Sequence, residues 1–186
     1  MKARFSRAEI LDALQEVNNL LQQKEIRGEI CVFGGKTMIL AFDARESTRD
    51  VDAVFRPARE IREAANQTAQ TKGLEEHWLN DGVKGFLSSE GEFQSLNHLP
   101  DFSHLQIIAP APQYLLAMKC MAARTPGYET SGDKNDVKFL VNYLGLKEAN
   151  QALDIVERYY GNQPIHVKTR FFVEEIFEEM AAEDAS

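Results

Sequence analysis

The chain has 186 residues, of which 44% are apolar and 27% are charged, and its formal net charge is −8. The apolar content suffices for a folded core, whereas the acidic balance disfavours a general nucleic-acid-binding surface, because affinity for nucleic acid comes largely from neutralised phosphates. No apolar run reaches membrane-spanning length, and residues 1–10 lack the apolar core of a secretion signal. We therefore expect a cytoplasmic protein with no membrane partner.

The first half of the chain predicts helices that alternate with short strands. Ser6 and Glu9 form a capping-box pattern ahead of apolar residues at helical spacing, so a helix is expected to begin there and to end near Lys24. The other elements expected in this half are a strand at 29–33, a helix at 36–44, a strand at 50–55 and a helix that Pro57 opens and Gly73 ends.

The second half predicts mainly helices. Residues 74–103 are interrupted by glycine and proline and carry one short strand pattern at 83–87, and a clearer strand is expected at 105–108. The helices expected after Pro110 lie at 112–124, 133–144, 147–160 and 165–182. We therefore expect an α/β (α+β) fold, in which a small mixed sheet in residues 1–110 is followed by a C-terminal helical bundle in residues 111–186, the two forming one compact unit.

Two carboxylates on the second strand form the first candidate site. Asp50 and Asp52 are two residues apart, so their side chains leave the strand from the same face. Two like charges side by side are unfavourable unless a cation or a basic group lies between them. A hard divalent ion such as Mg²⁺ takes oxygen ligands from one or two carboxylates and from substrate phosphates. The structural alternative is a polar pair at a strand end.

The residues around this pair favour a phosphate ligand. Gly34 and Gly35 lie between a strand and a helix, where backbone can approach a phosphate and a helix N-terminus offers free N–H groups. The order of strand, turn, helix and strand returns the two carboxylates to the side of this turn. The same part of an otherwise acidic chain is rich in arginine, namely Arg45, Arg49, Arg56, Arg59 and Arg62.

These motifs resemble the nucleotidyltransferase superfamily of DNA polymerase beta, and most closely its small AbiEii-type toxin-like branch. Gly34 and Gly35 are followed after fourteen residues by Asp50 and Asp52, with Thr48 two positions before the first aspartate. A second motif, with Lys119 in 115–124 and then Asp133 and Asp136 in 133–137, is similar to that branch's lysine-bearing helix and the helix after it. Residues 78–81 and 84–87 also look like a stretch of those relatives, and the resemblance spans about 30–144.

The resemblance implies a metal-dependent nucleotidyltransferase that moves a nucleoside monophosphate from a nucleoside triphosphate to a tRNA or protein acceptor. It also implies a toxin–antitoxin or defence setting, with a cognate antitoxin or another partner protein. Asp50 and Asp52 would hold Mg²⁺ or Mn²⁺, and Lys119 and Asp136 would join them as catalytic residues. The residues implied to bind nucleotide are Gly34, Gly35, Lys36, Thr48 and Arg49.

Lys119 has two interpretations. It lies in an otherwise apolar helix, where a buried ammonium needs an anionic partner such as a phosphate or Asp136. The alternative is a surface lysine whose charged end extends into water. Asp136 is expected to orient Lys119 or to accept a proton from the acceptor group, whereas Asp133 is expected to be the N-cap of its helix.

The chain departs from the family pattern at a third carboxylate. Active members usually carry one on a later strand, but the strand at 105–108 has His104 and Gln106 at the relevant positions and no acid. Lys36 follows the two glycines where relatives often have a small hydroxyl residue, and Gly132 stands where they often have lysine. The second hypothesis is therefore a catalytically degenerate member of the fold that binds nucleotide or a partner protein without turnover.

Overall fold

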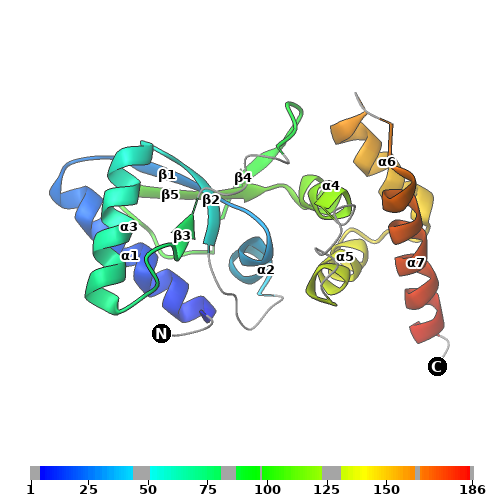
Figure 1. The fold of residues 1–186 in the computed structure, drawn as a ribbon, viewed down its shortest axis with the longest axis horizontal. Coiled ribbons are helices and arrows are strands. Elements are labelled where there is room, and N and C mark those ends of the chain that lie inside the picture. The colour runs from blue at the N-terminus through cyan, green and yellow to red at the C-terminus, as the bar shows by residue number, and fades with distance from the viewer. Residues whose placement is uncertain are drawn as a thin grey trace. The chain divides into compact units, whose positions relative to one another are not determined.

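The structure, a computed structural model, describes residues 5–43, 51–80, 87–96, 98–122, 131–161 and 164–184, without the side chains at 36, 131–133 and 184. The chain divides into two compact units. The first comprises Met1–Gly85 and Phe93–Ala109, and the second comprises Phe86–Glu92 and Pro110–Ser186. Figure 1 labels the helices and strands of both units.

The first unit is built on a five-stranded mixed sheet with the order β3-β2-β1-β5-β4. Its strands are β1 (Gly28–Val32), β2 (Val51–Arg56), β3 (Leu79–Asn80), β4 (Phe93–Ser95) and β5 (Leu105–Pro110). Strand β1 pairs with β2 antiparallel and with β5 parallel, and β2 pairs with β3 parallel. The three strands expected at 29–33, 50–55 and 105–108 therefore share one sheet, and the predicted mixed-sheet α/β class is confirmed.

Local sequence signals explain the helices of this unit, which are α1 (Arg7–Gln23), α2 (Gly35–Phe42) and α3 (Ala58–Lys72). The Ser6 backbone N–H donates to Glu9 Oε2 at 3.0 Å, and the Glu9 N–H donates to Ser6 Oγ at 3.4 Å, which confirms the predicted capping box. Helix α3 ends at Lys72 and is capped by Gly73, whose φ of 65° is readily adopted by glycine.

The two faces of the sheet differ in their surroundings. Ile30, Val32 and Ala53 are fully buried in one core cluster with apolar residues of α1 and α3, which pack against each other along this face (Figure 1). Side chains alternate along a strand, so the intervening residues point to the other face. On that other face, Asp52 and Val54 of β2 and Ile108 of β5 are only partly buried. Gln106 of β5 is exposed there. Helices α1 and α3 thus cover one face, and the other is more open.

The second unit is helical, as predicted. Its helices are α4 (Pro112–Ala122), α5 (Ser131–Tyr143), α6 (Ala149–Tyr160) and α7 (Val167–Asp184), and α4 contacts the other three. The preceding segment 87–92 is bound to this bundle, because the Ser88 N–H donates to the Tyr114 hydroxyl at 2.8 Å and the Ser88 hydroxyl donates to the Tyr159 carbonyl. No helix in the described part of the chain is long and apolar enough to cross a membrane.

Three details differ from the expectations or lie outside the described residues. Strands β3 and β4 were not expected, because two or three residues are too few to show an alternating pattern. Helix α5 begins at Ser131, so the expectation that Asp133 is the N-cap is wrong. The strand expected at 83–87 lies almost entirely outside the described residues.

Gly91 is required by the ring of Tyr114. A Cβ atom at Gly91 would lie 2.7 Å from Tyr114 Cε1 and 2.8 Å from Cζ, closer than real Cβ contacts. We expect Gly91→Ala to destabilise the second unit by about 1–3 kcal/mol, the usual cost of an overpacked site, as measured by urea denaturation. The same change in a Tyr114→Ala background should cost less. An equal cost in both backgrounds would contradict this explanation.

A ladder of ion pairs joins α5 to α7. Lys134 Nζ lies 2.9 Å from Glu179 Oε1, and Lys138 Nζ lies 3.1 Å from Glu179 Oε2. The hydrogen bonds from these ammonium groups hold the pKa of the Glu179 carboxyl below its ordinary value of 4.5. The stabilising contribution of Glu179 is therefore present above pH 4.5 and is lost as the pH falls through the lowered pKa.

Glu179→Gln should remove this acid-sensitive contribution. We expect the melting temperature of the variant to fall less steeply than that of the parent as the pH is lowered below 4.5. The effect should be small and should weaken with added salt, because the groups are solvent-accessible. Glu178→Gln, on the same helix, is the matched control and should leave the pH dependence unchanged. Identical profiles for the parent and Glu179→Gln would contradict the assignment.

Candidate functional site

The candidate site begins with the turn between β1 and α2. Gly34 has φ 65° and ψ −142°, a backbone conformation that is essentially restricted to glycine. Thr37 Oγ1 in the first turn of α2 donates to the Val32 carbonyl at 2.9 Å, which holds the helix start against the end of β1. Gly35 is the first residue of α2. The first N–H groups of a helix have no partner within the helix, so this turn is suited to an anion.

Asp52 lies directly beside this turn. The Phe33 N–H donates to the Asp52 carbonyl at 2.9 Å, and a Cβ atom at Gly34 would lie 3.4 Å from Asp52 Oδ2. Asp52 is partly buried, and it points to the sheet face opposite the one that carries Val51 and Ala53. The expected juxtaposition of the Asp52 carboxylate with the glycine turn is therefore present.

Other predicted ligands lie outside the described residues. These are Thr48, Arg49 and Asp50, together with the side chain of Lys36. Among the described residues, no three His, Cys, Asp or Glu side chains form a cluster suited to a metal. Asp52 does fit a Mg²⁺ or Mn²⁺ site of the kind in which one or two carboxylates are supplemented by phosphate oxygens and water.

The three described arginines of the expected basic stretch contact their own unit. Arg56 forms an ion pair with Glu29 at 3.0 Å, and Arg59 pairs with Glu63 at 3.0 Å. The Arg62 guanidinium lies over the Phe55 ring, 5.7 Å from its centroid. These interactions account for three of the five arginines that suggested phosphate binding, while Arg45 and Arg49 lie outside the described residues.

Strand β5 bears no acid on the face to which Asp52 points. Its core-facing residues are Leu105, Ile107 and Ala109, which are buried, so Gln106 and Ile108 point to the other face. The His104 ring precedes the strand, and its Nδ1 lies 3.0 Å from Ser103 Oγ. Within β5, the two side chains on this face are therefore an amide and an aliphatic group, and neither is a carboxylate.

Lys119 and Asp136 form a buried ion pair in the second unit. Lys119 Nζ of α4 lies 2.7 Å from Asp136 Oδ2 of α5, and the two residues are 8% and 2% exposed. The prediction that Asp136 supplies a partner for Lys119 is confirmed, and a lysine that extends into water is excluded. The pair links two helices, a structural role that its geometry explains without a ligand.

Neither cysteine is suited to nucleophilic chemistry. Cys31 of β1 and Cys120 of α4 are both buried and free of disulfide bonds. Burial raises the pKa of each thiol to about 12, and the nearby charge of Glu29 adds to the effect at Cys31. Both thiols are therefore protonated at neutral pH. A reactive cysteine must instead be a thiolate at that pH.

No protein-family model, curated protein or solved structure matches this chain. The likeness to AbiEii-type nucleotidyltransferases therefore rests on the sequence motifs themselves.

Proposed function

We propose that this protein is a metal-dependent nucleotidyltransferase that moves a nucleoside monophosphate from a nucleoside triphosphate to an RNA or protein acceptor. The observation that carries the proposal is the Asp52 carboxylate beside Gly34, at the N-terminus of α2. This arrangement puts a carboxylate next to the N–H groups at the start of a helix. The carboxylate is suited to a divalent cation, and the N–H groups are suited to a phosphate.

The residues of this site would act by positioning and by charge. The backbone N–H groups at the start of α2 would bind a phosphate of the nucleotide, and Gly34 lets that phosphate approach the backbone closely. Asp52 would hold Mg²⁺ or Mn²⁺, which when bound neutralises phosphate charge. Positioning and charge neutralisation account for most of the catalysis of phosphoryl-type transfer.

A second function is supported by strand β5. Because Gln106 and Ile108 occupy its positions on the face to which Asp52 points, a third carboxylate ligand is missing from this strand. A protein with this fold could bind a nucleotide or a partner protein, such as a cognate antitoxin, without transferring the nucleotide. This alternative uses the same turn and the same carboxylate.

Labelling in cell extract tests the two functions together. The full chain is incubated with each nucleoside triphosphate carrying a labelled α-phosphate, with Mg²⁺ or Mn²⁺, and the RNA and protein fractions are analysed separately. Label in a tRNA or protein that disappears with a chelator supports transfer. Metal-dependent nucleotide binding in equilibrium dialysis without transferred label supports the degenerate protein. The absence of both label and binding would overturn nucleotide transfer and nucleotide binding alike.

A further inference from the structure

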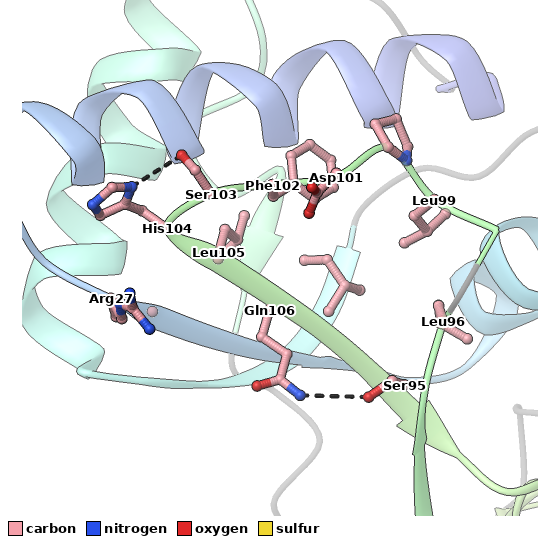
Figure 2. Close-up of a pocket in the computed structure, with 13 residues that line it drawn as sticks. Arg27, Ser95, Leu96, Leu99, Asp101, Phe102, Ser103, His104, Leu105 and Gln106 are labelled. Carbon is pink, nitrogen blue, oxygen red and sulfur yellow. Dashed lines mark hydrogen bonds between the residues drawn. The ribbon is translucent and has the colours of Figure 1, made fainter.

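A second candidate site lies in the first unit, away from Asp52. A pocket of about 540 Å³ lies where β1 and β5 begin, and the loop 99–104 forms one of its walls (Figure 2). Gly34, in contrast, follows the end of β1. No sequence motif marks this pocket, because its lining comes from three separate segments, 27–28, 95–96 and 99–107.

One end of the pocket is basic. The Gly28 N–H donates to the His104 carbonyl at 2.8 Å, so this main-chain bond brings Arg27 and His104 to the same end. Figure 2 shows both side chains there, with Ser103 bonded to the His104 ring. No carboxylate in the described part of the chain forms an ion pair with the exposed Arg27. The guanidinium is therefore available to bind an anion through its planar set of N–H donors.

The rest of the pocket has a mixed lining, in which Ser95, Ser103 and Gln106 accompany apolar side chains. Leu99 and Phe102 are partly buried and pack against the main core, and they line the pocket with the buried Leu105. These apolar side chains can contact the hydrocarbon part of a ligand whose charged end is held by the polar groups. The Asp101 carboxylate lies beside Phe102, away from Arg27 (Figure 2). A negative charge is therefore favoured at the Arg27 end and disfavoured near Asp101.

We propose that this pocket binds a small organic monoanion, such as a monocarboxylate. Its charged group contacts Arg27 and His104, and its apolar part contacts Leu99 and Phe102. Arginine recognises a carboxylate through two parallel hydrogen bonds, which supplies the orientation. The site is separate from the carboxylate and turn assigned to the nucleotide, so it stands whether or not the protein transfers nucleotides.

Benzoate and phenylacetate serve as probes, with benzyl alcohol as the neutral analogue and benzylamine as the cationic one. Each is titrated into the ¹⁵N-labelled full chain, and chemical shifts of backbone amides are followed by NMR. The carboxylates are expected to shift the amides of Gly28 and of residues 103–106. Arg27→Gln should weaken their binding by about tenfold or more, because a hydrogen bond to a charged group is lost. Arg59→Gln, at an exposed arginine outside the pocket, should leave binding unchanged.

A second variant keeps the test independent of Arg27. Ser95→Trp places a large side chain at an exposed position of the lining and should block the carboxylates without disturbing the core. Equal binding of benzylamine and benzoate would overturn the proposal. So would undiminished binding to Arg27→Gln or to Ser95→Trp, and so would the absence of shifts at Gly28 and residues 103–106 with any carboxylate.

Discussion

Asp52→Asn is expected to weaken Mg²⁺-dependent nucleotide binding by at least about a hundredfold, because even residues that only support a metal ligand typically change metal affinity 10–100-fold. The substitution keeps the size of the side chain and removes the negative charge beside Gly34. The fold should be retained, since Asp52 is only partly buried and lies outside the core cluster. Isothermal titration calorimetry with a nucleoside triphosphate and Mg²⁺ measures the loss.

The control for this prediction is another carboxylate of the same unit. Asp12 of α1 forms an exposed ion pair with Lys72, and Asp12→Asn should leave nucleotide binding unchanged. If Asp52→Asn and Asp12→Asn bind nucleotide as the parent does, the Asp52 site is wrongly assigned. If both variants lose binding, the loss reflects total charge rather than a ligand at Asp52.

Lys119→Met is expected to destabilise the second unit by about 3–5 kcal/mol, the usual cost of breaking a buried ion pair from one side. Methionine retains most of the lysine's volume, so the loss arises from the Asp136 carboxylate, which is 2% exposed and would be left without the ammonium 2.7 Å away. Urea denaturation followed by circular dichroism measures the change. Unfolding of the whole helical unit should shift to lower urea concentration.

Two variants distinguish the pair from a general effect of charge. Lys119→Met combined with Asp136→Leu should recover much of the lost stability, because an apolar pair of similar volume often replaces a buried ion pair without net cost. Lys24→Met breaks a half-exposed pair with Glu63 and should cost far less stability, because exposed ion pairs contribute little. A Lys119→Met variant as stable as the parent would show that the ion pair does not support the fold.

The fold was predictable where local interactions decide the structure. Helix α1 follows from the Ser6 capping box and from apolar residues at helical spacing, and α3 follows from Pro57 and Gly73 at its two ends. Strands β1 and β5 are short apolar runs between turn residues, which is enough to locate them. Such signals act within a few residues and do not depend on the remainder of the chain.

Strands β3 and β4 could not be predicted from local sequence signals. The segments 79–80 and 93–95 are too short to show the alternation of apolar and polar residues that identifies a strand. All three residues of β4 are also exposed. They are strands because β2 and β5 offer unpaired backbone groups at the sheet edges. The assignment of 87–92 to the helical unit has a similar cause, since it depends on bonds from Ser88 to residues 26 and 71 positions away.

The sequence by itself determined the types of residue at the candidate site and their spacing along β1, α2, β2 and α4. Only the tertiary structure decided what they meet, because pairing between strands and packing between helices join positions distant in the chain. Antiparallel pairing of β1 with β2 brings Asp52 beside Gly34. Packing of α4 against α5 buries Lys119 and brings its ammonium to Asp136, the outcome that separates a paired lysine from one extending into water.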